Sequence, residues 1–178
     1  MDARRIKAVL DRVPREFSGK EAQAGWFPGA HYEDGTSVAY VAMIQENGAP
    51  ERGIPARPFM KPTADAHGEQ WVETLKDGVK AVASGKATAD QVFEAMALQM
   101  AGDTQAQIAS NAVAPLSPTT LVLRKWRREG RKITGATVGE AAAAYAADPS
   151  IIDGVPDDPL QDTGLMIATL TGQVGAPE

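Results

Sequence analysis

The most constrained stretch of this chain is Ile54-Pro55-Ala56-Arg57-Pro58-Phe59-Met60-Lys61-Pro62-Thr63. Each of its three prolines fixes its own φ and disfavours the helical conformation in the residue before it, which predicts a stiff, extended backbone. The stretch therefore holds one aromatic side chain, Phe59, and one cation, Arg57, at fixed positions. Two interpretations stand on these residues alone: a rigid connector whose Phe59 fills the core, or a segment that displays both side chains for contact.

The length and composition favour one soluble domain and exclude several kinds of site. The chain has 178 residues, of which 43% are hydrophobic and 23% charged, as in ordinary globular domains. It has no cysteine, which excludes disulfides, thiolate zinc sites and a cysteine nucleophile. Its two histidines disfavour a multi-histidine metal site. No apolar run reaches membrane-spanning length and the N-terminus lacks a signal-peptide core, so we expect a reducing, aqueous compartment and no membrane contact.

Charge is distributed unevenly along the chain, although the net charge of −5 makes no general case for binding nucleic acid. Basic residues gather near the N-terminus and in the run Arg124–Lys132, and neither Lys nor Arg follows Lys132. The acidic residues beyond that point are Glu140, Asp148, Asp153, Asp157, Asp158, Asp162 and Glu178. Such asymmetry is typical of electrostatic docking between copies or partners, and equally of a solvated helix face with an acidic loop.

Hydrophobic periodicity and capping residues predict several helices. Ala3–Val13 is expected to be an amphipathic helix that ends before Pro14. Ser37, Thr88 and Ser117 are the predicted N-caps of three others. The further helices are expected over 38–46, 68–83, from 89 to an interruption at Gly102-Asp103, over Thr104–Asn111, over 121–128 and over 137–147.

Two segments near the chain ends favour strands, and together with the helices they predict an α+β fold. Glu21–Phe27 precedes a Pro-Gly turn, and Gly164–Val174 alternates in a way that is typical of a terminal strand. We therefore expect a small antiparallel sheet packed by several helices within a single domain, residues 1–178.

The chain carries few residues in patterns that indicate chemistry. It has no phosphate-binding glycine fingerprint and no nucleophile elbow, and His31 and His67 stand without recognisable partners. The aspartates at 157, 158 and 162 lack the alternation of a calcium loop and favour an acidic, solvated turn. The basic run Arg124–Lys132 surrounds Trp126, a combination that can contact phosphate but more often faces solvent or an acidic protein surface.

Five short motifs follow one another in an order that is more specific than any one of them. They are Gly35-Thr36-Ser37-Val38-Ala39; Gln45-Glu46-Asn47-Gly48; Ile54-Pro55-Ala56-Arg57-Pro58-Phe59; and, after a helical middle, Pro115-Leu116-Ser117-Pro118-Thr119-Thr120 and Pro159-Leu160-Gln161-Asp162-Thr163-Gly164-Leu165-Met166. This ordered set resembles the neck or tail-completion proteins of long-tailed bacteriophages, including Mu-like phages and prophages. The resemblance extends from about Gly25 to Val174.

The chain departs from that family pattern in two places. Asn47 stands where an aromatic residue often follows the glutamate. The segment from Lys132 to Asp158 resembles an insertion or decoration within the compact family pattern, and the resemblance implies nothing about its role.

The resemblance implies a structural protein of the head–tail joint, without catalysis, metal or cofactor. It implies a ring, hexamer or dodecamer, that contacts the tail terminator or tail tube on one side and head-closure or adaptor proteins on the other. The implied location is the virion neck, with the host cytoplasm during assembly. The residues expected to serve the fold or the subunit contacts are Arg57, Pro58, Phe59, Arg124, Arg127, Arg128, Asp162, Thr163 and Gly164.

Three alternatives remain open on the sequence. The chain could be a tail terminator or head-closure protein of the same joint. It could instead be a DNA-contacting adaptor that uses the basic helix 124–132. A hydrolase would require His31 to converge with the acidic loop.

Overall fold

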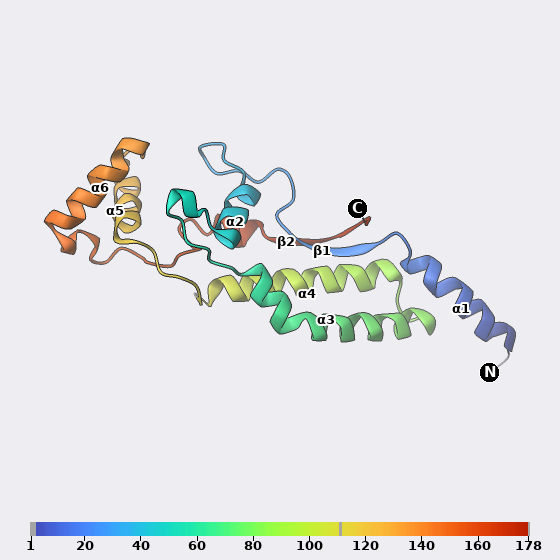
Figure 1. Cartoon of the computed structure of the whole chain (residues 1–178). Helices are drawn as coiled ribbons and strands as arrows, with labels where there is room; N and C mark the ends of the chain where they lie inside the picture. Colours follow the sequence, from blue (N-terminus) through green and yellow to red (C-terminus); the bar gives the residue numbers. More distant parts are fainter. Residues whose placement is uncertain (1–2, 111, 178) are drawn as a thin grey trace.

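Two long helices form the centre of the molecule in the computed structural model, which describes residues 3–110 and 112–177. Helices α3 (Met60–Ala83) and α4 (Ala89–Ala109) make an antiparallel hairpin (Figure 1). The predicted capping box begins α4, because the Thr88 hydroxyl accepts from the Gln91 amide while the Gln91 side chain accepts from the Thr88 amide. This hairpin contacts the first helix and both strands of the molecule.

A two-stranded antiparallel ribbon lies along α4. Strands β1 (Glu21–Gly25) and β2 (Thr171–Gly175) pair from Glu21↔Gly175 to Gly25↔Thr171, and both contact α4. The ribbon thus pairs a segment near the start of the chain with a segment near its end. The prediction of an α+β domain with a small antiparallel sheet packed by several helices is confirmed.

The remaining helices extend the molecule in two directions from the hairpin. Helix α1 (Ala3–Phe17) projects at one end, and helices α5 (Pro118–Arg128) and α6 (Gly135–Ala147) form the other end (Figure 1). Between them lie α2 (Val38–Asn47), α7 (Leu165–Thr169) and the short 3-10 turn η1 (Pro50–Arg52), whereas the 3-10 turn η2 (Pro149–Ile152) packs against α5 and α6.

The core lies where α2, α7 and the start of α3 meet the end of α4. Phe59 is its largest fully buried side chain, and the Trp26 ring meets Phe59 edge-on at 5.6 Å. The other buried members of this core are Val38, Ala42, Ile108, Leu160, Met166 and Leu170. The Trp26 indole N–H donates to the Met166 carbonyl oxygen at 2.8 Å, so its polar end is also satisfied.

Two predicted helix boundaries are wrong, the end of α1 and the start of α3. Helix α1 continues through Pro14 to Phe17, because the Phe17 ring packs on Phe93 at 5.4 Å and holds the last turn against α4. Helix α3 begins at Met60, so the extended stretch ends at Phe59. Pro62 is compatible with this start, since the first-turn amides of a helix have no partner within the helix.

Tertiary contacts also decide the structure of two later segments, α4 at Gly102-Asp103 and the C-terminal segment Gly164–Val174. Helix α4 runs unbroken through Gly102-Asp103, where Asp103 accepts from the Trp71 indole N–H at 2.7 Å. The segment predicted as a strand over Gly164–Val174 divides into α7 and β2, and Gln105 caps α7 by donating to the Leu170 carbonyl oxygen at 3.0 Å. Asn111, the predicted end of a resumed helix, lies outside the described residues.

Candidate functional site

Arg57 is a buried cation that joins three separate segments. Its side chain donates from Nε to the Ala114 carbonyl oxygen at 2.8 Å, from Nη1 to Gln45 Oε1 at 3.2 Å, and from Nη2 to the Pro115 carbonyl oxygen at 3.1 Å. Its own amide donates to the Gln45 carbonyl oxygen at 2.6 Å. We call Arg57 with these acceptors the Arg57 anchor. It ties the end of α2 and the stretch before α3 to the loop before α5.

The anchor residue is only 5% exposed, so its charge is removed from water. Burial lowers the pKa of Arg57 from its ordinary value. Three neutral oxygens replace the lost hydration of the guanidinium. The planar fork of an arginine suits this arrangement, whereas a lysine offers a single nitrogen.

Glu46 organises the residues that follow Arg57. Its carboxylate accepts from the Phe59 amide at 2.7 Å, the Met60 amide at 2.9 Å and the Lys61 amide at 3.0 Å. A carboxylate at this position satisfies unpaired first-turn amides and complements the positive end of the helix dipole. Glu46 therefore sets where α3 begins and holds Phe59 in the core. Pro58, which stands between Arg57 and Phe59, is exposed.

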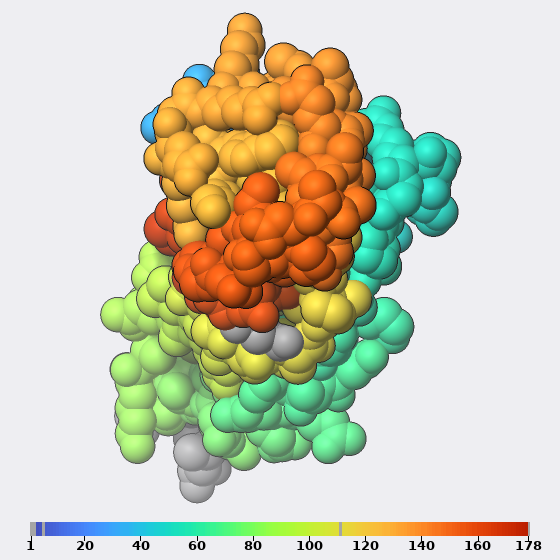
Figure 2. Space-filling view, turned by 90° about the vertical axis from the view of Figure 1, so that its left-hand side faces the viewer, coloured from blue at the N-terminus to red at the C-terminus, as the bar shows by residue number. Residues whose placement is uncertain are grey.

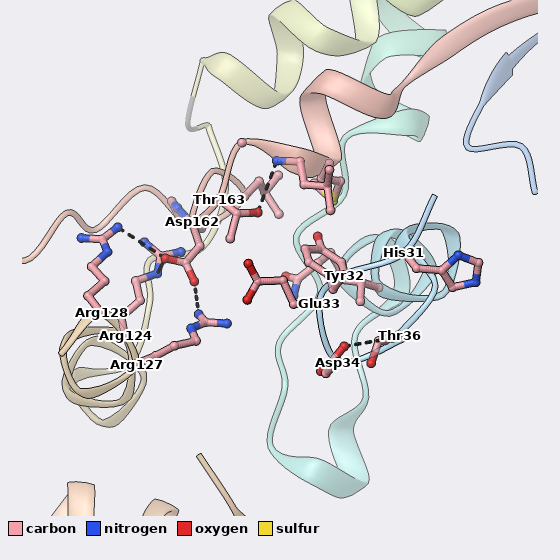
Figure 3. A pocket seen from close by; sticks show the side chains of 17 residues that line it. His31, Tyr32, Glu33, Asp34, Thr36, Arg124, Arg127, Arg128, Asp162 and Thr163 are labelled. Atoms are coloured by element: carbon pink, nitrogen blue, oxygen red, sulfur yellow. Dashed lines mark hydrogen bonds and ion pairs between the residues drawn. The ribbon is translucent and has the colours of Figure 1, made fainter. Parts of the chain in front are cut away.

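Asp162 is held by three arginines of α5. Arg124 Nε lies 3.1 Å from Asp162 Oδ1, Arg128 Nη2 lies 3.4 Å from the same oxygen, and Arg127 Nη2 contacts Oδ2. We call this group the Asp162 clamp. It fastens the stretch before α7 to α5 (Figure 3).

Arg124 is the buried member of the clamp. It also donates from Nη1 to the Pro156 carbonyl oxygen and from Nη2 to the Asp158 carbonyl oxygen, both at 2.9 Å. Burial lowers the pKa of Arg124, and the negative charge of Asp162 partly opposes that effect. Arg127 and Arg128 keep more than two fifths of their side chains exposed, at 57% and 44%, so they form the outer surface of the clamp.

The residues after Asp162 redirect the chain into α7. The Thr163 hydroxyl accepts from the Leu165 amide at 3.3 Å, and Gly164 takes a left-handed conformation with φ 69°. A residue with a Cβ is strained at such a φ, which explains a glycine at this position.

An open groove of about 910 Å³ lies between the Asp162 clamp and the loop 31–36. Gln45 lines this groove and accepts from Arg57, so one side chain connects the Arg57 anchor with the groove wall. Tyr32 lies on the opposite wall, and its pKa is raised by burial and by the negative charge of Asp162. The groove therefore combines exposed cations, carboxylates and an aromatic ring, a mixture suited to contact with a polar protein segment.

The structure separates the predicted site residues into two groups. Arg57 and Phe59 lie in the interior, whereas the clamp arginines and the stretch Asp162–Gly164 come together at the groove. Sequence reasoning did not assign a role to Gln45 or Glu46, although it quoted their motif. Their spacing of 12 to 15 residues from the groups they bind leaves no periodic signal.

The contacts of the basic run do not favour the DNA-contacting alternative. The Arg131 guanidinium lies 3.9 Å from the centre of the Trp126 ring and pairs with Glu140, so one face of the Trp126 ring is already occupied. Lys125 Nζ donates to the Ile151 carbonyl oxygen at 3.1 Å. These cations, like the clamp arginines, already have partners within the chain.

The hydrolase alternative also gains no support from the geometry. His31 Nδ1 lies 3.1 Å from the Gly29 carbonyl oxygen, and its ring points away from Asp162 (Figure 3). Among residues 3–110 and 112–177, no group of three or more His, Cys, Asp or Glu side chains is placed to hold a metal ion.

No helix in the described part of the chain is long and apolar enough to span a membrane. Comparisons of the chain with protein-family models, with curated proteins and with solved structures gave no match.

Proposed function

We propose that this chain is a structural subunit of the neck of a long-tailed bacteriophage, where it completes the tail and joins it to the head-connector complex as part of a ring. The observation that carries the proposal is that the ordered motifs contact one another. Gln45 binds Arg57, Arg57 binds Pro115, and the helix that follows Pro115 carries Arg124, which binds Asp162.

These contacts support the resemblance because the residues of the ordered motifs stabilise one framework of helices. Residues that are far apart in sequence together hold α2, α3, α5 and α7 in one arrangement. A set of motifs that serves one framework is expected to occur as a set, in a fixed order, wherever that framework is used.

The shape and charge of the molecule also suit a subunit of a ring. The chain is elongated, with α1 at one end and α6 at the other (Figure 1). A heterologous ring sets one surface of each copy against a different surface of the next copy. A chain whose two ends differ in structure and charge can supply these two different surfaces. The ring is a hexamer or a dodecamer in this proposal, with the tail on one side and the head connector on the other.

The proposal is tested by deleting the gene from a phage or prophage genome that encodes this chain and examining the lysate by electron microscopy. We expect filled heads and normal-length tails that remain unjoined, and joined particles after complementation with the wild-type chain. Complete, infectious particles in the deletion lysate would overturn the proposal.

The same micrographs distinguish the neighbouring roles in the joint. Tails of uncontrolled length would indicate a tail terminator, and heads that have lost their DNA would indicate a head-closure protein. Either result overturns the tail-completion role.

A further inference from the structure

Helix α1 has an apolar stripe of which only the C-terminal half is covered by this chain. Ile6, Leu10, Val13 and Phe17 recur at intervals of three and four residues and so share one face of the helix. At the C-terminal end, Phe17 packs on Phe93 at 5.4 Å and Arg12 donates to the Val82 carbonyl oxygen at 2.9 Å. These contacts hold the last turns of α1 against α3 and α4.

The N-terminal half of the stripe continues beyond the body of the molecule. Leu10 is 67% exposed and Ile6 is 43% exposed, although both continue the stripe that Phe17 uses for packing. Figure 1 shows α1 extending away from the α3–α4 hairpin. Two large aliphatic side chains in one stripe on a projecting helix are typical of a contact surface.

The charge around this stripe indicates what covers it. The sequence of α1 contains five basic residues and two acidic residues, so the helix is cationic. Two copies of α1 would repel each other, which disfavours a symmetric α1–α1 contact. A partner for α1 needs an apolar surface bordered by acidic groups.

The opposite end of the same chain has these properties. Helix α6 exposes Val138, at 46%, and Ala142 one turn later on the same face. Asp148 and Asp153 follow α6 and are exposed, while Glu140 on α6 pairs with Arg131, and no basic residue follows Lys132. Figure 2 faces this end, where α6 and the segment after it, in orange, form much of the surface.

We propose that the N-terminal half of α1 docks on α6 of a second copy of this chain, in a head-to-tail contact. Leu10 and Ile6 would lie against Val138 and Ala142, while the basic residues of α1 would face the acidic groups at the end of the neighbour. Because the two surfaces are at opposite ends of one molecule, the contact is heterologous and closes into a ring or extends as a chain. It rests on the proposed function for its biological setting and specifies one joint of that ring.

Sedimentation velocity of the purified full chain tests this contact. We expect concentration-dependent association of the wild-type chain that Leu10→Glu weakens by about tenfold or more, since the variant places a charge in an apolar contact. Leu98→Glu is the matched control, because Leu98 is exposed to a similar degree, at 63%, on α4. The control variant should associate as the wild type does, and circular dichroism checks that each variant is folded.

A mixing experiment tests the head-to-tail geometry. The variant Leu10→Glu has an intact α6 surface, and the double variant Val138→Glu/Ala142→Glu has an intact α1. At a concentration where each variant alone is monomeric, an equimolar mixture should form a dimer and nothing larger. A monomeric wild-type chain at all concentrations, equal loss in Leu98→Glu, or a mixture that stays monomeric would overturn the contact.

The failure of this contact is distinguishable from the failure of the proposed function. Association is measured on the purified protein and head–tail joining in the phage lysate. A chain that associates as described but whose deletion leaves complete particles would keep the contact and overturn the neck assignment. A monomeric chain that is nevertheless required for joining would do the reverse.

Discussion

A buried guanidinium stabilises a fold only when its donors find acceptors, because the loss of hydration costs several kcal/mol. Arg57 meets this condition with acceptors from two sides, Gln45 before it and the loop Ala114–Pro115 after the α3–α4 hairpin. Arg124 meets it with Asp162 and two carbonyl oxygens. Both arginines are therefore connections between segments, and their removal leaves buried acceptors without donors.

Arg57→Ala should lower the free energy of unfolding by about 3 kcal/mol, because it leaves buried oxygens unsatisfied and opens a cavity. Arg57→Lys should recover little, since one ammonium cannot reach all three acceptors. Urea denaturation followed by tryptophan fluorescence measures both. Arg52→Ala is the control, because Arg52 is exposed in η1, and a loss of the same size there would contradict the role of the anchor.

Tyr32 should ionise above the usual tyrosine pKa of about 10, since burial and Asp162 both raise its pKa. A tyrosine pKa that is higher in the folded state contributes stability that is complete below the unfolded pKa and is lost as pH rises through the folded pKa. Asp162→Asn should lower the Tyr32 pKa, because it removes the negative charge. Tyrosinate absorbance in a Tyr40→Phe/Tyr145→Phe background measures the shift.

Asp153→Asn is the matched control for this titration. It removes one exposed carboxylate that does not contribute to the Tyr32 shift. Equal titration curves for Asp162→Asn and the unchanged background would show that the clamp does not act on Tyr32.

At the scale of the elements, helix ends and close contacts decide how the long hairpin is joined to the rest. Glu46 determines where α3 starts, and Ser117 begins α5 by accepting from the Thr120 amide at 3.2 Å. The ribbon approaches α4 closely at Gly172, where a Cβ would collide with the Ala97 backbone. These are features of single elements, but each depends on a neighbouring one.

Glu46→Ala should lower the free energy of unfolding by about 1–2 kcal/mol, because it removes the acceptor of three amides at the start of α3. The loss should be local first, with faster hydrogen exchange at the Met60 and Lys61 amides. Glu51→Ala, at an exposed position in η1, is the control. Unchanged exchange at both amides would mean that Glu46 does not hold the start of α3.

Gly172→Ala should destabilise the chain by about 1–3 kcal/mol, since the new methyl group forces β2 away from α4. Gly25→Ala is the matched control in the paired strand, because a Cβ at Gly25 meets nothing within 4 Å. Thermal unfolding compares the two variants. Equal stabilities would place the ribbon farther from α4 than the structure does.

At the scale of the whole molecule, the question is whether the segment 132–158, predicted as an insertion or decoration, is separable from the rest of the fold. Its helix α6 packs on α5, and Val122 in α5 and Ala141 in α6 are both fully buried. Arg124 and Lys125 donate to carbonyl oxygens within this segment. The segment is thus attached to the clamp helix through both its core and its hydrogen bonds.

Replacing residues 132–158 by a short Gly-Ser linker should therefore loosen α5 as well as remove α6. We expect hydrogen exchange of the α5 amides to rise strongly, because Arg124 loses acceptors and Val122 loses cover. The α3–α4 hairpin should remain protected and serves as the internal control. Protection of α5 at the level of the full chain would instead support a separable decoration.

The sequence was sufficient where the stabilising contacts are local. The N-caps Thr88 and Ser117 act on residues three positions later, so their motifs contain both partners. The α+β fold class also followed from periodicity and capping along the chain. The predictions failed at Pro14, Met60 and Gly102, because contacts from other elements decide whether a helix continues there.

The opening stretch shows the same division. By itself, the sequence predicted a stiff, extended stretch over Ile54–Thr63 with Arg57 and Phe59 at fixed positions, since proline restricts the backbone regardless of its surroundings. The stretch is free of helix only as far as Phe59. Only the tertiary structure decided that Phe59 fills the core, that α3 begins at Met60, and that Arg57 binds Gln45 and the loop before α5. The reason is physical: a buried cation is defined by acceptors that lie up to 58 residues away, and only the folded chain brings them together.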